Sequence, residues 1–367
     1  MSIKPPFRAD QVGSLLRPQS LTKARTAVKA GKISAAELRA EQDAAIRAAV
    51  AKQEQIGLQA VTDGEMRRDY WHLDFVRQLE GVAITQNPGL KFGLAETEEQ
   101  PPIAQVAGKV RYARPIMVDD FAFLKSATSR IAKMTIPSPT ILHLRGGRSA
   151  ISRTAYPDLE EFWSDVGAAY RTEIAALAAA GCTYLQLDDV GFSYLCDPNF
   201  QETCRKNGDD PMTLPQRYVD VINAALAQRP AGMSVTIHTC RGNYRSTWVA
   251  QGGYEPVAEV MFQANVDGFF MEFDDDRSGG FEPLRFLPKS KRAVLGLITS
   301  KSGGLEREDQ IRRRIDEAAK IVPLENLCLS PQCGFSSTHE GNKLTEDDQW
   351  RKLALVVDIA RKVWGDN

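Results

Sequence analysis

Residues 293–299 read "AVLGLIT", an almost uninterrupted apolar run of strand length. A strand exposed on one face alternates apolar and polar residues, whereas a strand of a parallel sheet is buried on both faces and reads as a continuous run. Four further runs in the second half of the chain predict strands, at 184–189 ("YLQLDD"), 234–240 ("SVTIHTC"), 268–275 ("GFFMEFDD") and 327–333 ("LCLSPQC"). The second half therefore predicts a buried parallel sheet.

Helical patterns separate these strands. Residues 157–181 begin with Pro-Asp and acidic residues and end at a glycine, which are start and stop signals of a helix. Other helices are predicted at 35–57, about 214–228, near 255–264, 307–322 and 345–365, and earlier strands at 11–16 ("QVGSLL"), 59–65 ("QAVTDGE") and 139–144 ("PTILHL"). Eight strands that mostly alternate with helices predict an α/β fold of the (β/α)8 TIM-barrel class, as one domain over residues 1–367. The irregular stretch 85–116 is expected to be an insertion in an early loop between a strand and a helix.

Bulk composition argues against nucleic acids and membranes as partners. The chain has 367 residues with 46 Lys and Arg against 47 Asp and Glu, a formal net charge of −1. No large field of one sign therefore attracts a polyanion or an anionic surface. The N-terminus has no basic region followed by an apolar run, and the apolar stretches are too short to span a bilayer. We therefore expect a cytoplasmic protein with reduced thiols, and composition leaves its oligomeric state open.

Ligand-type side chains gather at the predicted carboxyl ends of the strands, where a barrel enzyme carries its chemistry. His238 and Cys240 are two positions apart, so on an extended strand both point to the same side. Glu272 lies near the end of the next strand, and Cys333 ends the last one. A nitrogen, two thiolates and a carboxylate suit a tetrahedral Zn2+ ion. The His-x-Cys pair alone is more often a packed strand end, and it is the convergence of four such residues that favours a metal site.

The motifs "IHTCRGN" (237–243), "FFMEFDD" (269–275) and "SPQCGFSS" (330–337) resemble the zinc-ligand motifs of cobalamin-independent methionine synthases. The similarity is to the C-terminal catalytic barrel, and in particular to short, single-barrel relatives without the N-terminal domain. The resemblance implies a TIM barrel, a homocysteine substrate, and methylfolate or another compound as methyl donor. It also implies a Zn2+ ion held by His238, Cys240, Glu272 and Cys333.

The same resemblance implies an amino-acid site. The stretches "VGS", "DGE" and "QLDD" are similar to the segments with which the family holds homocysteine, and they give this role to Ser14, Glu65 and Asp188. Two carboxylates can clamp an ammonium group, while a hydroxyl and backbone N–H groups take a carboxylate. Without the resemblance, Ser14 is a turn residue after a strand, and the two acids form an ion pair with a nearby arginine such as Arg67 or Arg68.

The methyl-donor side departs from the family pattern. The stretch 295–306 ("LGLITSKSGGLE") has no histidine where the family carries its proton donor. The family's folate-stacking tryptophan falls near Leu144, and its pterin-reading glutamate falls near Tyr194. The general acid is therefore unassigned, and His339, just past Cys333, is a candidate substitute. The thiol half of the site is kept, whereas the identity of the methyl donor stays open.

Three functions are compatible with these features. The first is a zinc-dependent thiol S-methyltransferase that converts L-homocysteine to methionine, like the 5-methyltetrahydropteroyltriglutamate–homocysteine methyltransferases. A thiol with a pKa near ~8.5 is mostly protonated at neutral pH, and Zn2+ converts it to a nucleophilic thiolate. The second is a zinc-thiolate alkyl transferase of the epoxyalkane:coenzyme M type, against which an amino-acid clamp argues because coenzyme M has a sulfonate and no amine. The third is a non-catalytic zinc- or thiol-binding protein.

Overall fold

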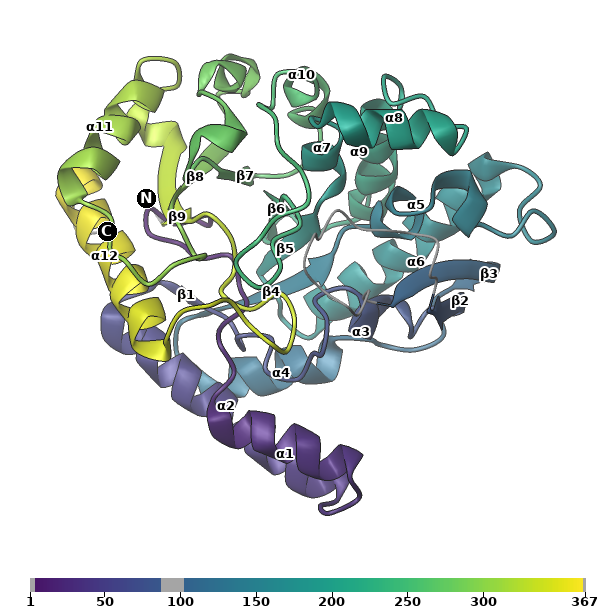
Figure 1. Ribbon diagram of the computed structural model, residues 1–367, viewed down its shortest axis with the longest axis horizontal. Coiled ribbons are helices and arrows are strands. Elements are labelled where there is room, and N and C mark those ends of the chain that lie inside the picture. The colour runs from purple at the N-terminus through teal and green to yellow at the C-terminus, as the bar shows by residue number, and fades with distance from the viewer. Residues whose placement is uncertain (1–3, 87–101, 366–367) are drawn as a thin grey trace.

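The computed structural model describes residues 4–86 and 102–365, and its centre is a curled parallel sheet surrounded by helices (Figure 1). The sheet has seven strands in the order β1-β4-β5-β6-β7-β8-β9, and every neighbouring pair is parallel. Their bounds are β1 Ala60–Val61, β4 Ile131–Pro137, β5 Tyr184–Asp189, β6 Ser234–Thr239, β7 Gly268–Glu272, β8 Arg292–Ile298 and β9 Leu327–Pro331. The predicted parallel α/β fold is confirmed, and among the described residues its parallel sheet has seven rather than eight strands.

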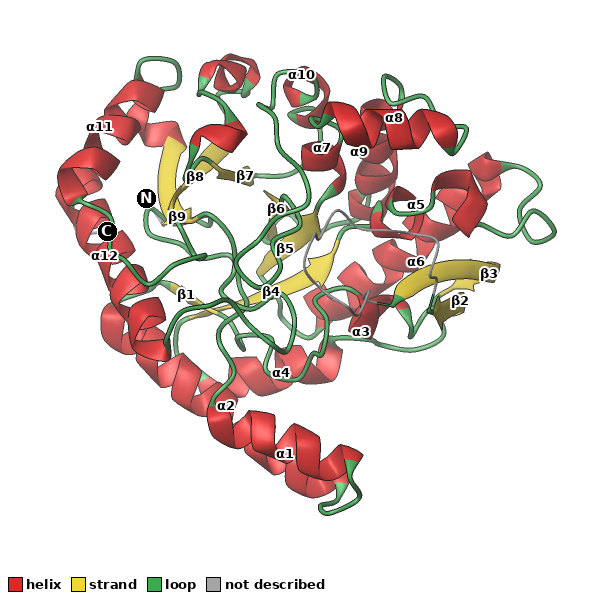
Figure 2. Ribbon diagram, in the orientation of Figure 1, coloured by secondary structure: helices red, strands yellow, loops and turns green. Residues whose placement is uncertain are grey.

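Helices follow most of the strands and cover the outside of the curled sheet (Figure 2). The longer ones are α1 Gln19–Lys29, α2 Ala35–Ile56, α4 Val118–Ala127, α6 Leu159–Ala179, α8 Pro198–Lys206, α9 Leu214–Leu226, α11 Glu308–Ala319 and α12 Glu346–Trp364. One-turn helices are α3 Leu73–Val76, α5 Ile141–Leu144, α7 Gly191–Tyr194 and α10 Ala258–Met261, and 3-10 turns lie at η1 Gly147–Ala150, η2 Asp276–Ser278, η3 Glu282–Phe286 and η4 Leu324–Asn326. Capping boxes begin α2 (Ser34 with Glu37) and α12 (Thr345 with Asp348), and they satisfy first-turn N–H groups that lack intrahelical partners.

The N-terminal segment lies between β9 and β1, where a closed barrel would have its eighth strand. Ala9 forms a single parallel bridge with Leu329 of β9. On the other side, the hydroxyl of Thr62, just after β1, donates to the Gly13 carbonyl at 2.7 Å. The strand predicted at 11–16 is wrong, because Gly13 turns the backbone with a φ of 149° and these residues form no strand ladder. The segment therefore fills the gap in the curl through isolated hydrogen bonds.

Strand β4 has no counterpart among the predicted strands, and the strand predicted at 139–144 is wrong because helix α5 lies there. The cause is Lys133, which interrupts the apolar pattern of β4 with a charged residue. Its side chain is fully buried, with the ammonium nitrogen 3.1 Å from Asp10 Oδ1. A buried charge is tolerated when a partner of opposite charge accompanies it. Asp10 comes from the N-terminal segment, so the partner that allows this strand is far away in sequence.

A separate antiparallel pair, β2 (Glu80–Thr85) and β3 (Ile103–Arg111), lies between β1 and β4 in the chain. The insertion predicted at 85–116 overlaps this pair, and its residues 87–101 lie outside the described residues. The backbone N–H of Ser152 donates to the Val106 carbonyl at 2.8 Å. That bond ties β3 to the segment that precedes α6.

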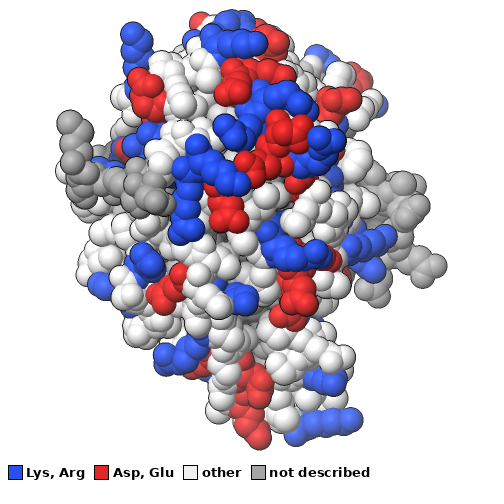
Figure 3. Space-filling view, turned by 90° about the vertical axis from the view of Figure 1, so that its left-hand side faces the viewer, with Lys and Arg blue, Asp and Glu red and all other residues white. Residues whose placement is uncertain are grey.

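The surface carries charges of both signs. Figure 3 shows Lys and Arg side chains interspersed with Asp and Glu side chains over one face of the molecule. Exposed side chains of opposite charge form pairs among the described residues, such as Arg285 with Glu255. Among the described residues, every helix is too short or too polar to cross a membrane.

Candidate metal centre

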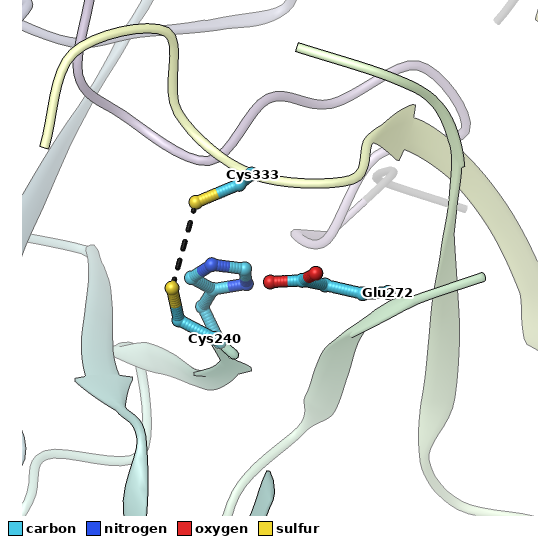
Figure 4. A group of neighbouring side chains, drawn as sticks. Cys240, Glu272 and Cys333 are labelled. Atoms are coloured by element: carbon cyan, nitrogen blue, oxygen red, sulfur yellow. Dashed lines mark hydrogen bonds between the residues drawn. The ribbon is translucent and has the colours of Figure 1, made fainter. Parts of the chain in front are cut away.

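Four ligand-type side chains converge at the carboxyl ends of β6, β7 and β9. His238 lies near the end of β6, Cys240 follows that strand directly, and Glu272 is the last residue of β7. Cys333 lies just beyond β9. The ligand atoms all lie within 4.8 Å of one another, and the two cysteine Sγ atoms are 3.6 Å apart (Figure 4). The structure therefore brings together the four residues that the sequence predicts as ligands.

A glycine in the intervening strand allows this convergence. β8 lies between β7 and β9 in the sheet, and its Gly296 pairs in register with Glu272. A Cβ at Gly296 would lie 2.6 Å from the Cα of Gln332 and 2.8 Å from the carbonyl oxygen of Met271. Real Cβ atoms do not approach backbone that closely. Glycine here lets the chain after β9 fold inward, so that Cys333 reaches the end of β7.

The group is buried, and its donor set suits a metal ion. His238, Glu272 and Cys333 are 2%, 0% and 3% exposed. Neither ring nitrogen of His238 has a hydrogen-bond partner among the described residues. Buried polar atoms of native proteins are almost always paired, so an unpaired imidazole beside two thiols marks a place for a ligand. Nitrogen, sulfur and carboxylate donors in a set of four fit Zn2+.

The two thiols differ in their affinity for a proton. The hydrogen bond from Cys333, helped by His238, holds the pKa of Cys240 well below its usual value. The same hydrogen bond, together with burial, raises the pKa of Cys333. Burial and the negative charge of Cys240 also raise the pKa of Glu272. Without a metal ion, the protein therefore favours the thiolate form of Cys240 only. Ionisation of Cys333 beside an ionised Glu272 becomes favourable when a divalent cation balances the negative charges.

Glu272 is held by groups that the sequence reading did not assign. Its Oε1 accepts from Asn243 Nδ2 at 2.6 Å and from the backbone N–H of Arg241 at 2.9 Å. Its Oε2 accepts from the Arg277 guanidinium at 2.7 Å. The sequence signal for Asn243 and Arg277 is only that each follows a ligand by a few residues, and loop geometry decides the contact.

A pocket opens beside the ligands. Three of the ligands and all three predicted clamp residues line it: His238, Cys240, Cys333, Ser14, Glu65 and Asp188. The remaining lining residues, which the sequence reading did not assign, are Val12, Trp71, Gly242, Asn243, Gly334 and Ser337. The predicted amino-acid clamp and the ligand group thus face one cavity.

Glu65 and Asp188 are buried carboxyl groups with raised pKa values. Burial, with a contribution from the charge of Glu65, raises the pKa of Asp188 to about 7. Burial also raises the pKa of Glu65, although Arg68, with its NH1 nitrogen 3.6 Å from Glu65 Oε2, opposes this. The ion pair with an arginine that the alternative predicts is therefore found for Glu65, with Arg68 as its partner. Because both pKa values stay raised despite Arg68, the pair favours a further positive charge such as an ammonium group.

Ser14 meets the segment that follows Cys333. Its hydroxyl accepts from the backbone N–H of Ser336 at 3.3 Å, and its carbonyl accepts from the N–H of Phe335 at 2.9 Å. A Cβ at Gly334 would lie 2.0 Å from Ser14 Oγ. Glycine at this position therefore keeps the serine hydroxyl in its place on the pocket wall.

His339, the candidate general acid, is not among the residues that line this pocket. Its side chain is 35% exposed, and its Nδ1 lies 3.5 Å from Glu340 Oε2. Leu144 and Tyr194, at the positions of the family's folate contacts, are buried on α5 and α7. A catalytic role for His339 stays a prediction.

Comparison with known proteins identifies the family. A family model described as "Cobalamin-independent synthase, Catalytic domain" matches residues 7–362. The chain belongs to the cobalamin-independent methionine synthase family. As a member of that family it is a methyltransferase. The resemblance read from the strand-end motifs is confirmed.

Individual relatives cover nearly the whole chain. The uncharacterized proteins YxjH and YxjG of Bacillus subtilis (strain 168) are each 47% identical to it, over 98% of this chain and 96% of theirs. The methionine synthase of Pyrococcus abyssi is 25% identical over 96% of this chain and 91% of its own. The crystal structure of a Listeria monocytogenes protein, provisionally assigned as a vitamin-B12-independent methionine synthase, is 39% identical, covers 100% of both chains and has a TM-score of 0.80. A B12-independent methionine synthase from Shewanella sp. W3-18-1, in complex with selenomethionine, has the same fold, with a TM-score of 0.72, 19% identity and 97% of both chains covered.

Proposed function

We propose that this methyltransferase is zinc dependent and transfers a methyl group to the sulfur of L-homocysteine, forming methionine. The observation that carries the proposal is a pocket lined both by three of the four metal-ligand residues and by the buried carboxyl pair. Relatives named methionine synthase, and a structure of the same fold in complex with selenomethionine, support an amino acid of the methionine type as ligand.

The four ligands define the chemistry at the sulfur. Zn2+ held by His238, Cys240, Glu272 and Cys333 would supply a Lewis acid that keeps a substrate thiol ionised at neutral pH. Two thiolates and one carboxylate against a charge of +2 give this set a formal charge of −1. An electron-rich ligand set leaves a neighbouring sulfur nucleophilic, which a methyl transfer requires.

The clamp residues orient the amino acid. Glu65 and Asp188 bind the ammonium group. Burial raises the pKa of both carboxyls, and a cation beside them favours their ionised forms. The Ser14 hydroxyl, held by the backbone N–H of Ser336, receives the carboxylate. Fixing both ends of the amino-acid backbone directs the side-chain sulfur toward the ligand group and removes the need for a random encounter.

The methyl donor is the open part of the proposal. Positions at which the family contacts folate carry Leu144 and Tyr194 in this chain, and both are buried. A donor screen with zinc-loaded protein and homocysteine distinguishes the candidates: methyltetrahydrofolate mono- and polyglutamates, methylcobalamin, a methylated corrinoid protein and small methylated thiols. Methionine formed from one donor class identifies it.

Cys333→Ser tests the proposal directly. A serine hydroxyl is a poor zinc ligand, so the variant should lose bound zinc and methionine formation together. Cys204→Ser, which changes a buried cysteine on α8 outside the ligand group, should keep both. Full zinc content and full turnover in Cys333→Ser would show that the centre is assigned wrongly.

An epoxyalkane:coenzyme M type of activity is the second candidate, since it uses the same zinc-thiolate chemistry. Its thiol carries a sulfonate, which the buried carboxyl pair Glu65 and Asp188 would repel. Cobalt-substituted protein discriminates the two, because a thiol that reaches the metal changes the visible absorption. Homocysteine should change the spectrum at lower concentration than coenzyme M, and the opposite order would favour the second candidate.

A further inference from the structure

The carboxylate of Glu272 has few directions left in which to bind a metal. Its Oε1 already accepts two hydrogen bonds, from Asn243 Nδ2 at 2.6 Å and from the backbone N–H of Arg241 at 2.9 Å. Its Oε2 accepts from Arg277 NH2 at 2.7 Å. A carboxylate offers about four lone-pair directions, so these donors leave roughly one for a metal ion. The donors around Glu272 therefore decide how it is presented to the centre.

Arg277 is itself held in place on several sides. Its NH1 pairs with Asp275, and its NH2 also reaches Asp274 Oδ1 at 3.2 Å. Asp274 in turn pairs with Lys301, which follows β8. The guanidinium carbon lies 4.7 Å from the centre of the Trp248 ring, in the loop after β6. Segments that follow three neighbouring strands thus fix the direction of one guanidinium group.

The local backbone structure brings Arg277 back to Glu272 at the end of β7. The short 3-10 turn Asp276–Ser278 begins with Asp275, whose Oδ1 accepts from the Arg277 N–H at 3.1 Å. Gly279 ends the turn with a φ of 69°, and a Cβ there would lie 2.9 Å from the Cα of Gly253. The turn reverses the chain, so an arginine five positions after Glu272 returns to it.

Burial makes the contact between Arg277 and Glu272 different from a surface ion pair. The side chain of Arg277 is 5% exposed, and that of Glu272 is 0% exposed. Exposed pairs contribute little, whereas removal of one partner of a buried pair leaves an uncompensated charge. The four-ligand set has a formal charge of −1 with a divalent ion, and Arg277 places a positive charge directly against the carboxylate of this set.

We propose that Arg277 is a positioning residue of the metal centre, which fixes the orientation of Glu272 and offsets its charge so that the remaining lone pair faces the ion. This inference rests on the zinc centre of the proposed function. Groups in contact with a metal ligand typically change metal affinity by about 10- to 100-fold when they are removed. Arg277→Gln should therefore lower zinc affinity by roughly 10- to 100-fold, while Arg277→Lys, which keeps the charge, should recover part of that loss.

The test uses purified full-length protein and two measurements that do not depend on turnover. Competition with a zinc chelator gives the affinity, and the visible absorption of the cobalt-substituted protein reports ligand geometry. The matched control is Arg285→Gln, which removes an exposed arginine from its pair with Glu255 and should change neither measurement. Zinc affinity within about twofold of wild type and an unchanged cobalt spectrum in Arg277→Gln would overturn the inference.

Two further outcomes keep this inference separate from the proposed function and from a folding defect. Absence of zinc binding by the wild-type protein would overturn both the zinc centre and the role of Arg277. Normal wild-type binding with no effect of Arg277→Gln would overturn only the latter. If Arg277→Gln does not fold, Asp275→Asn removes a half-exposed partner of Arg277 instead. It should weaken zinc binding by a smaller factor, and unchanged affinity and spectrum would again refute the inference.

Discussion

Replacing Asp188 by Asn should increase the stability of the metal-free, substrate-free protein, and the gain should grow with pH. Burial and the charge of Glu65 raise the pKa of the Asp188 carboxyl from its usual 3.8 to about 7. Because of this difference in pKa, ionising Asp188 costs roughly 4 kcal/mol more free energy in the folded chain than in the unfolded chain. Asparagine cannot ionise, and its side-chain oxygen can still accept from Gln186 Nε2, which lies 2.7 Å from Asp188 Oδ1.

The sign of the pH dependence follows from the raised pKa of Asp188. Between pH 3.8 and about 7 the folded protein keeps a proton on this carboxyl that the unfolded chain releases, so its contribution to stability is full below pH 3.8 and falls as the pH rises to 7. Above about pH 7 the contribution stays constant. The difference in unfolding free energy between Asp188→Asn and wild type should therefore increase across this window and then level off.

Urea denaturation of both proteins in chelator, at intervals from pH 5 to pH 8, measures this difference. Asp309→Asn is a control on the exposed surface, where Arg307 lowers the pKa of the carboxyl, and it should show no gain in stability with pH. A difference between Asp188→Asn and wild type that is independent of pH, or that shrinks as the pH rises, would show that ionisation of the buried Asp188 carboxyl does not destabilise the folded protein.

Two other substitutions test separate parts of the molecule. Gly334→Ala should displace the Ser14 hydroxyl, because its Cβ would lie 2.0 Å from Ser14 Oγ. We expect homocysteine to bind roughly 10- to 100-fold more weakly by titration calorimetry with unchanged zinc content, as for a lost hydrogen bond to a charged group; equal affinity would remove Ser14 from the clamp. Asp10→Ala should leave the buried ammonium of Lys133, 3.1 Å away, without its carboxylate partner. The expected cost is about 3–5 kcal/mol in urea denaturation, and a cost below about 1 kcal/mol would show that the pair does not stabilise the sheet.

The strands that could be predicted from the sequence are those with continuous apolar runs. Runs at 184–189, 234–240, 268–275, 293–299 and 327–333 correspond to β5, β6, β7, β8 and β9. Burial on both faces imposes this composition. Strand β4 could not be found in this way because Lys133 lies within it, and its partner Asp10 is identified only in three dimensions.

In the candidate site, too, some residues could be predicted from the sequence and others could not. Ligands at strand ends could be predicted, because parallel strands deliver their carboxyl ends to one edge of the sheet. His238 lies near the end of β6, Cys240 follows that strand directly, and Glu272 ends the neighbouring strand. Arg277 and Gly334 could not be predicted, because their contacts depend on how loops after the strands turn back. Residue type alone did not separate Arg277, which holds a buried carboxylate, from the many arginines in surface pairs.

X-ray absorption at the zinc edge counts the sulfur atoms bound to the metal with and without substrate. The zinc-loaded protein should show two sulfur neighbours at about 2.3 Å, from Cys240 and Cys333, with lighter nitrogen and oxygen neighbours from His238 and Glu272. Addition of L-homocysteine should raise the number of sulfur neighbours to three, because the pocket directs the substrate sulfur to the metal. A sulfur count that stays at two in the presence of saturating homocysteine would contradict the account.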